Sequence, residues 1–200
     1  MPTMPRRSAA AVADTRTEVL DAAVRRASVD GLEGLTIGRL AGELPMSKSG
    51  LHGLFGSKEA LQVATFDRAV DAFTREVWLP VEDREPGLPR LLALIDRWIA
   101  YHRLGALPGG CFVTTATIEF DARPGPLRDA VAGARRRMHS ALEADIRTAV
   151  AEGDLPSETD PRDVAFSLYA LASAASQAIQ LREPGASARA RRCMRSLLGQ

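Results

Sequence analysis

One short segment, residues 36–59, constrains the fold of this chain more than any other. A run of apolar residues at helical spacing is interrupted at Leu44-Pro45-Met46, and a second short run begins at Ser47. Gly56 ends the second run, and Ser57 is typical of the start of another helix. Two short helices joined by a tight turn form a helix-turn-helix, whose second helix can enter the major groove of DNA. The segment therefore predicts a DNA-binding unit.

The charge of the chain limits which part of its surface can bind DNA. The 200-residue chain has a formal net charge of only +1, so it is not a general polycation. Between residues 36 and 58, three basic residues (Arg39, Lys48 and Lys58) stand against one acidic residue, Glu43. This local excess has the sign that DNA binding requires. We expect any contact with DNA to be confined to this patch.

Cysteine content and hydropathy indicate the compartment. The two cysteines, Cys111 and Cys193, are too few for a disulfide framework. The N-terminus lacks the apolar core of a signal peptide, and no apolar run is long enough to span a bilayer. We therefore expect a soluble cytoplasmic protein with free thiols and no membrane contact.

The rest of the chain predicts an all-α fold with about nine helices. Residues 1–13 are rich in Pro, Arg and Ala, and we expect a mobile arm there. Helical periodicity or caps predict further helices at 14–29, 58–79, 91–102, 127–151, 161–182 and 186–198, with Pro80 ending the second. Residues 111–118 are rich in β-branched side chains, but they have no partner strand to take their backbone hydrogen bonds, so a short buried helix is favoured.

Several longer motifs carry a resemblance to a known family. In the N-terminal third they are Leu20-Asp21-Ala22-Ala23, Gly31-x-x-Gly34-Leu35-Thr36-Ile37, Leu40-Ala41, Met46-Ser47-Lys48-Ser49-Gly50-Leu51 and Phe55-Gly56-Ser57-Lys58-Glu59-Ala60-Leu61. In the second half they are Pro108-Gly109-Gly110-Cys111-Phe112, Glu119-Phe120-Asp121, Arg123-Pro124-Gly125-Pro126 and Leu127-Arg128-Asp129. Taken together, these motifs resemble the tetracycline-repressor (TetR) family of bacterial transcriptional regulators.

The resemblance implies an architecture and a function. It implies a three-helix helix-turn-helix DNA-binding domain at 14–60, after the arm at 1–13, and a helical bundle for ligand binding and dimerisation at 61–200. It also implies a ligand-responsive repressor, not an enzyme, that binds a pseudo-palindromic double-stranded operator as a homodimer. We expect the DNA-binding domain to have a core of its own.

The motif also designates residues for DNA contact. Small and polar side chains at the start of the second helix can approach bases and phosphates. A lysine in the first turn of the following helix opposes the helix dipole, a cost that a phosphate contact would offset. His52 stands where the family commonly has a tyrosine that contacts phosphate. The expected DNA-binding residues are Thr36, Ser47, Lys48, Ser49, Gly50, His52 and Lys58.

Aromatic and apolar residues of the later helices predict a ligand cavity, although each could equally belong to an ordinary core. Ligand sites in helical bundles are apolar cavities with a few polar anchors. The expected lining residues are Trp98, His102, Phe112, Thr115, Phe120, Met138, Phe166 and Tyr169. Because these faces carry almost no charge, we expect a small, uncharged or weakly polar apolar effector, anchored by Thr115 or His102.

The pair Cys111 and His102 leaves a second function open, namely a helical-bundle enzyme or a redox sensor. No motif supplies a carboxylate to orient the histidine, and there is no CxxC or other metal-ligand spacing, so neither metal nor cofactor is expected. Glu119 and Asp121 are two residues apart and do not face each other on a helix.

Assembly is predicted from residues 167–181, which are rich in small side chains and leucine. Such a face lets two helices pack closely. We expect Ala170, Ala174 and Ala178 to contact the same helix of a second copy, with the basic helix at 186–198 completing the interface.

Overall fold

The computed structural model describes residues 9–105 and 107–200, and these form helices and connecting loops without a strand. The elements are α1 (Ala9–Asp30), α2 (Ile37–Glu43), α3 (Lys48–Phe55), α4 (Lys58–Phe73), the π-helical segment η1 (Thr74–Trp78), α5 (Leu79–Glu82), α6 (Leu88–Leu104), α7 (Phe112–Phe120), α8 (Pro126–Ala151), α9 (Pro161–Gln180) and α10 (Ala186–Ser196). α4, η1 and α5 follow one another without a break, so the described chain has nine continuous helical stretches. The all-α prediction is confirmed.

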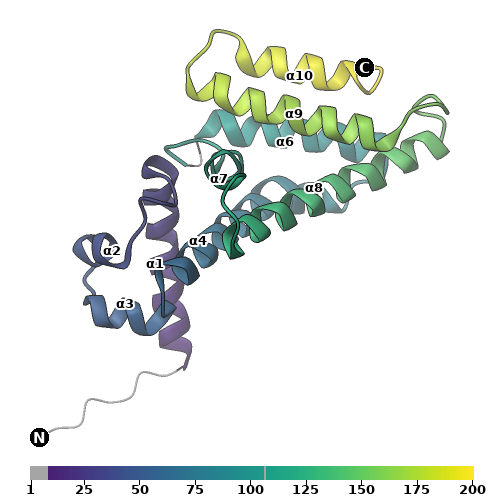
Figure 1. The fold of residues 1–200 in the computed structure, drawn as a ribbon. Coiled ribbons are helices and arrows are strands. Elements are labelled where there is room, and N and C mark those ends of the chain that lie inside the picture. Colours follow the sequence, from purple (N-terminus) through teal and green to yellow (C-terminus); the bar gives the residue numbers. More distant parts are fainter. Residues whose placement is uncertain (1–8, 106) are drawn as a thin grey trace, which may run out of the picture.

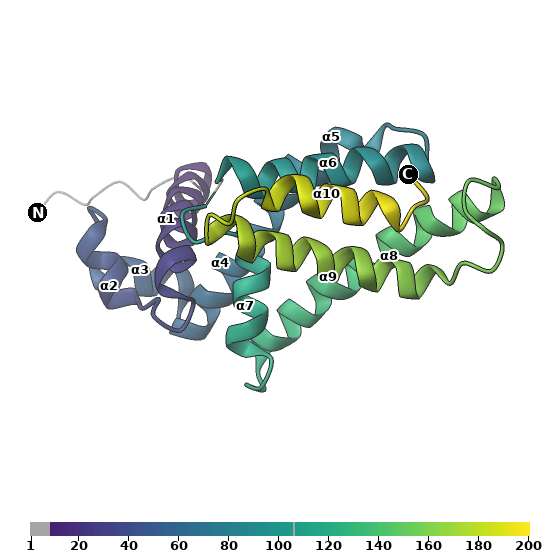
Figure 2. The ribbon, with the colours of Figure 1, turned by 90° about the horizontal axis from the view of Figure 1, so that it is seen from above.

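The helices are arranged in two groups. α1, α2 and α3 lie at one end of the molecule, and α4 runs from them into the second group (Figure 1). That group contains α6, α8, α9 and α10, with α7 between it and the first (Figures 1 and 2). α4 therefore belongs to both groups and connects them.

Helix starts follow from local capping, as the sequence predicts. The Ser47 hydroxyl accepts the backbone N–H of Gly50 at 3.1 Å, and that of Ser57 accepts the N–H of Ala60 at 3.0 Å. The Asp160 carboxylate caps α9 in the same way. Each cap satisfies one of the backbone donors that a helix N-terminus leaves without an intrahelical partner.

The start of the first helix differs from the sequence prediction. Residues 9–13, expected in the arm, are the first turns of α1, which begins at Ala9. Alanine has the highest helix propensity, and four of these five residues are alanine. The rest of the expected arm, residues 1–8, lies outside the described residues. Residues 111–118 are not a strand, because all but Cys111, the N-cap, belong to α7, and the helix prediction is confirmed.

The prediction that Pro80 ends its helix is wrong. The helix passes through Pro80 to Glu82 by widening to a π-helical turn over Thr74–Trp78. Proline cannot donate to the carbonyl four residues earlier, which is that of Glu76. The guanidinium of Arg97 on α6 donates to this carbonyl instead, at 2.7 Å. The π-turn and the arginine together accommodate the proline.

The apolar interior forms two clusters. One joins α4, η1 and α5 to α6, α8, α9 and α10, and holds the aromatic contact of Phe73 with Trp98. The other contains α1–α4 together with α7 and the first half of α8. This second cluster extends beyond the helix-turn-helix, because it includes Phe66 of α4 and Phe112 of α7, whose ring centroids are 6.5 Å apart. Whether residues 14–60 form a domain with a core of its own stays a prediction.

One buried ion pair fixes the far end of the bundle. The fully buried carboxylate of Asp145 on α8 accepts two hydrogen bonds from the Arg90 guanidinium, and a third from the backbone N–H of Gly87. A buried charge of this kind is tolerated only when it is paired and hydrogen-bonded. α8 is thereby held to the start of α6.

Candidate DNA-binding face and internal cavity

The helix-turn-helix presents the side chains that the sequence designates. Leu51 and Phe55 of α3 are buried in the apolar cluster shared with α1, α2 and α4, so the opposite side of α3 faces outward. That outward side carries exposed Ser47, Lys48, Ser49, Gly50 and His52. Thr36 is half-buried and caps α2 by accepting the N–H of Arg39. Whether these residues contact DNA remains a prediction.

The outward side of α3 also has little side-chain bulk at Gly53. A Cβ added to Gly53 would meet no atom within 4 Å, so this position is open to the surroundings. The Ser47 hydroxyl hydrogen-bonds that of Ser49 at 3.0 Å. Apart from Lys48 and His52, this side of α3 therefore carries only short side chains or none. A molecule that docks on it can come close to the helix backbone.

Lys58 is engaged in an ion pair that the sequence did not indicate. Its Nζ lies 2.8 Å from a carboxylate oxygen of Glu33, in the loop between α1 and α2. The hydrogen bond from Lys58 lowers the pKa of Glu33, with a contribution from its charge and from Arg123. A phosphate at this position would therefore have to compete with Glu33.

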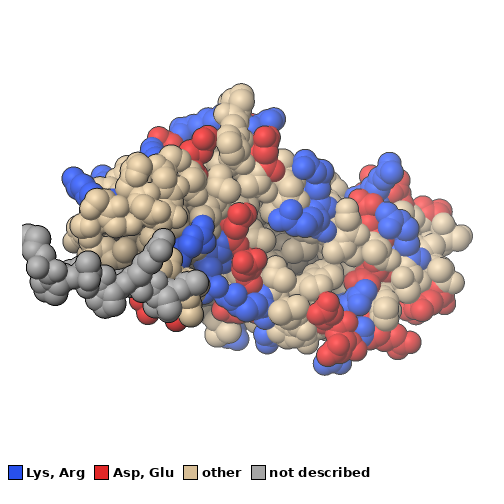
Figure 3. All heavy atoms as spheres, turned by 90° about the horizontal axis from the view of Figure 1, so that it is seen from below, with Lys and Arg blue, Asp and Glu red and all other residues tan. Residues whose placement is uncertain are grey.

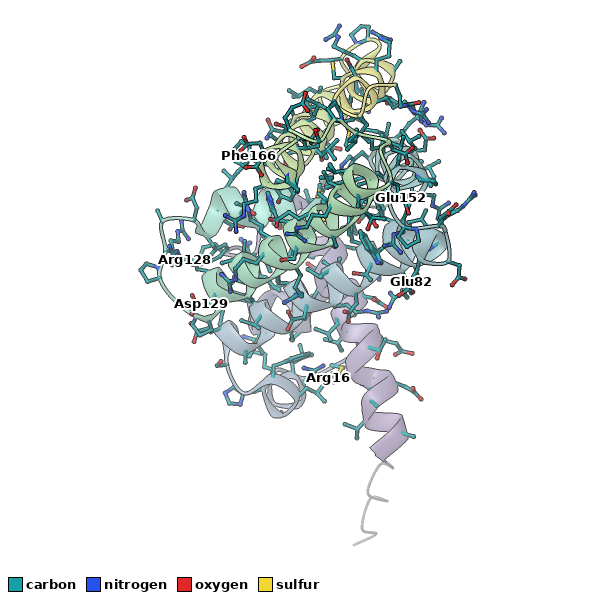
Figure 4. The ribbon with its side chains drawn as sticks, turned by 90° about the vertical axis from the view of Figure 1, so that its right-hand side faces the viewer. Arg16, Glu82, Arg128, Asp129, Glu152 and Phe166 are labelled. Carbon is teal, nitrogen blue, oxygen red and sulfur yellow. The ribbon has the colours of Figure 1, made fainter. Side chains whose placement is uncertain are left out.

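A further basic residue lies beside α3 and was missed by motif reasoning. The guanidinium of Arg16 on α1 lies 5.2 Å from the ring centroid of Phe55, the last residue of α3 (Figure 4). Little in the sequence indicated this position, because a single arginine among the polar residues of a helix is usually a solvent-exposed side chain. Seen from below, the left-hand end of the molecule, around α2 and α3, shows mainly uncharged atoms with a few basic groups, and the rest of this face carries both signs of charge (Figure 3).

A cavity of about 300 Å³ lies between α4, η1, α6, α7, α8 and α9. Its volume is at the small end of the range of roughly 300–1,000 Å³ typical of ligand pockets. Its lining is Val70, Phe73, Thr74, Trp78, Trp98, His102, Cys111, Val113, Thr114, Ala134, Arg135, Arg137, Met138, Ala141, Tyr169, Ala172 and Ser173. Trp98, His102, Met138 and Tyr169 are thus brought together, while their role toward a ligand remains a prediction.

Four of the residues predicted for the cavity do not line it. Phe112 is buried in the cluster of the helix-turn-helix, and the Thr115 hydroxyl donates to the Cys111 carbonyl while its neighbour Thr114 faces the cavity. Phe120 is buried near the end of α7 beneath Arg123. Phe166 is 64 % exposed on the outer side of α9 (Figure 4).

Two residues of the cavity lining carry buried polar atoms without partners in the described part of the chain. Trp98 and His102 are 4 % and 8 % exposed, yet Nε1 of Trp98 and both ring nitrogens of His102 have no hydrogen-bond partner among the described residues. Burial lowers the pKa of His102 to about 4, so the ring is neutral near pH 7. Cys111 lines the same cavity. In a catalytic Cys–His pair the thiol would be hydrogen-bonded to a ring nitrogen of the histidine, but neither nitrogen of His102 has a partner among the described residues.

Two arginines contradict the expectation of an uncharged cavity. Arg135 and Arg137 of α8 both belong to the lining, and no described Asp or Glu does. The guanidinium of Arg135 lies over the ring of Tyr169, 4.7 Å from its centroid. The wall therefore has a positive side.

α7 connects this cavity to the helix-turn-helix. Its N-terminal part (Cys111, Val113 and Thr114) lines the cavity, and near its other end Glu119 contacts the loop between α1 and α2. The loop before α7 also touches α1: a Cβ added to Gly109 would lie 1.5 Å from the carbonyl oxygen of Ser28. Sequence reasoning missed both contacts, because they join segments more than 80 residues apart.

α9 presents an apolar stripe to the outside. Ala170 and Ala174 are exposed and Ala178 is half-buried, at the four-residue spacing that keeps them on one side of the helix. Phe166, one step before them, and Leu181, just beyond them and 75 % exposed, extend the stripe. Whether a second copy covers this stripe remains a prediction.

Two further properties concern only the described residues. None of their helices has the length and hydropathy needed to cross a bilayer. They contain no group of three or more His, Cys, Asp or Glu side chains placed to bind a metal ion.

Comparison with protein families and curated sequences gives two results. Residues 87–194, more than half of the chain, match the family of tetracyclin repressor-like C-terminal domains. No curated protein matches the sequence.

Solved structures of this fold are similar to the whole chain. A TetR transcriptional regulator from Chloroflexus aurantiacus has a TM-score of 0.86 at 23 % identity, covering 94 % of this chain and 96 % of that one. AibR in complex with isovaleryl coenzyme A and operator DNA has 0.68 at 22 %, covering 85 % and 96 %. A regulator from Saccharomonospora viridis in complex with choline has 0.79 at 22 %, covering 94 % and 97 %. At these identities the similarity shows the fold.

Proposed function

The chain belongs to the tetracycline-repressor family of transcriptional regulators, and from this we propose that it is a ligand-responsive repressor that binds operator DNA as a homodimer. The observation that carries the proposal is the outward side of α3, where Ser47, Lys48, Ser49, Gly50 and His52 are exposed on a short helix anchored by Leu51 and Phe55. A recognition helix needs this combination of a buried side that fixes its orientation and an accessible side that enters the major groove.

We propose that two copies bind one operator. The stripe of Ala170, Ala174 and Ala178, extended by Phe166 and Leu181, offers an apolar surface that a two-fold partner would cover. Each copy would then place its α3 in one half-site, so the operator would be a pseudo-palindrome with half-sites about one helical turn apart or a multiple of it.

The effector would act through α7. A molecule that enters the cavity meets the first residues of α7, and Glu119 near the end of the same helix holds the loop that precedes α2. Repression is relieved if the ligand favours an arrangement of the two helix-turn-helix units that fits the operator less well. Coupling energies of this kind are typically about 1–3 kcal/mol.

The experiment is a binding assay on the DNA that flanks the gene of this protein. Fluorescence anisotropy should show tight, salt-dependent binding to one fragment, and footprinting should show a protected pseudo-palindrome. Lys48→Ala, exposed on α3, should weaken this binding. Binding to every fragment with equal affinity, or no binding at low salt, would exclude an operator-specific regulator acting on this DNA.

A further inference from the structure

The charge on the cavity wall indicates the chemical class of the ligand. We propose that the cavity binds a small amphipathic organic acid, with its carboxylate held by Arg135 and its apolar body enclosed by Phe73, Trp98 and Tyr169. The role of this acid as an effector rests on the proposed function. Its binding to the protein does not, because no DNA is involved.

Arg135 is unusual among the half-buried arginines of this chain. Arg68 and Arg90 each donate two or more hydrogen bonds to a carboxylate, that of Asp21 or of Asp145. Arg135 is also half-buried, but no carboxylate pairs with it among the described residues, and its contact is the face of the Tyr169 ring. A partly desolvated guanidinium without a counter-ion favours binding of an anion.

The contact with Tyr169 prepares the guanidinium for such a ligand. Stacking on an aromatic ring fixes the plane of the group and leaves its edge, which carries the N–H donors, available. A carboxylate can accept two parallel hydrogen bonds from that edge, which a hydroxyl cannot. His139, on the other side of this cluster, adds no charge near pH 7, because burial and Arg135 lower its pKa.

Arg137 gives the same side of the cavity a second positive charge. Arg137 is exposed and interacts with the charge of Asp67 on α4. Burial and Asp71 raise the pKa of Asp67, and the positive charge of Arg137 partly offsets that rise. Arg137 is therefore partly neutralised. For this reason the anchoring role is assigned to Arg135.

Two residues of the lining, Trp98 and His102, carry buried polar atoms that lack partners among the residues that the structure describes. Nε1 of Trp98 and both ring nitrogens of His102 lack partners, although more than nine-tenths of each residue is buried. Buried polar groups in folded proteins almost always have a hydrogen-bond partner. In this structure the three atoms are closed to a water-sized molecule, so a ligand oxygen would accept from Trp98 only after the lining side chains move.

The two tryptophans of the chain, Trp78 and Trp98, both line the cavity, so tryptophan fluorescence reports directly on its occupancy. The probes are 4-phenylbutyrate, 4-phenylbutan-1-ol and 4-phenylbutylamine, which share one apolar body and differ in charge. The acid should change the fluorescence saturably and bind at least about tenfold more tightly than the alcohol, while the amine should bind most weakly.

Substitutions assign the selectivity to one residue. Arg135→Gln should weaken binding of the acid by roughly tenfold to a hundredfold, the usual worth of hydrogen bonds to a charged group, and leave the alcohol unchanged. Arg136→Gln is the matched control, because Arg136 is the next residue, loses the same charge, and is exposed outside the cavity lining. Arg135→Lys keeps the charge without the planar group and should be intermediate; it also serves if the Gln variant fails to fold.

Three results would overturn the inference. They are equal or tighter binding of the alcohol or the amine, an equal loss of acid binding in Arg136→Gln, and no fluorescence change with any of the three probes. An acid that binds as expected but leaves the protein on its operator would contradict the proposed regulatory function and leave the ligand class in place. Conversely, operator release by a bound amine would support regulation and overturn the ligand class.

Discussion

The carboxylate of Glu119 accepts the backbone N–H of Leu32, 87 residues earlier in the chain, at 2.9 Å. Its other oxygen accepts the N–H of Glu33 at 2.8 Å. The loop that sets the position of α2 is thus held by the helix that also forms part of the cavity wall. Hydrogen bonds to a charged group contribute roughly 1.5–3 kcal/mol each, so this contact holds the loop to α7.

Removing that carboxylate should uncouple ligand from DNA. In Glu119→Ala we expect ligand binding, followed by tryptophan fluorescence, to be unchanged, and the effect of ligand on operator affinity to fall toward zero. Asp121→Ala is the control, because it removes a charge just beyond the end of α7 from an exposed side chain. Undiminished release of DNA by ligand in Glu119→Ala would show that the coupling takes another route.

A methyl group added at Gly53, on the outward side of α3, should have opposite effects on stability and on DNA binding. Gly53 lies in open space within a helix, so Gly53→Ala should raise the free energy of unfolding by up to about 1 kcal/mol. The added methyl should hold α3 away from the groove and weaken operator binding about tenfold or more, comparable to one lost base contact of ~1–3 kcal/mol. Gly133→Ala in α8 should stabilise without changing DNA affinity. Urea unfolding and anisotropy measure the two effects, and unchanged operator affinity in Gly53→Ala would place that residue away from the DNA.

The ion pair of Lys58 with Glu33 predicts how binding responds to salt. If Lys58 contacts a phosphate, Lys58→Ala should weaken binding equally on all sequences and reduce the slope of log K against log [salt] by about one. Glu33→Gln should strengthen binding, because it frees the lysine. In the double variant the gain from Glu33→Gln should disappear. An unchanged slope in Lys58→Ala removes the residue from the contact surface.

Assembly can be tested on the outer stripe of α9. Ala174→Glu would bury an unpaired charge if this stripe contacts a second copy, at a cost of several kcal/mol. Light scattering should then show a monomer or an aggregate, and operator binding should fall. Ala151→Glu, an equal change at the exposed end of α8, should stay dimeric. A well-folded dimer of Ala174→Glu would place the interface elsewhere.

His102 should make the free energy of unfolding decrease as the pH is lowered. Its folded pKa of about 4 lies below the unfolded value of 6.5, so the unfolded chain binds the extra proton first as the pH falls. The contribution is complete above about pH 6.5 and is lost on acidification toward pH 4, amounting to roughly 3 kcal/mol at most. His102→Phe should lose this dependence in urea titrations between pH 4 and 7. Asp67, whose raised pKa acts in the opposite direction, is present in both proteins and cancels in the difference. Parallel stability curves for the two proteins would contradict the shifted pKa.

Local signals in the sequence predict most of the fold. Ser47, Ser57 and Asp160 mark helix starts because a cap depends only on residues within one turn. Pro80 gave a wrong boundary because its effect depends on Arg97, which comes from another helix. The length of a helix can be predicted where its end depends on its own residues, and less well where a neighbour supplies the missing hydrogen bond.

The candidate cavity was harder to predict because orientation decides it. α7 is apolar on nearly all sides, so the sequence could not distinguish Thr114, which faces the cavity, from Thr115, which does not. Phe166 was predicted to line the cavity but is exposed, because the sequence does not distinguish an apolar residue on the surface from one in the core. Arg135 and Arg137 were missed since three successive arginines are typical of a solvated helix face.

The contact of Gly109 with Ser28 limits how this sequence can diverge. Even the smallest side chain at Gly109 would overlap the carbonyl oxygen of Ser28. Relatives that have lost this glycine would need α1 in a different place, and with it a different spacing between the loop before α7 and the DNA-binding helices.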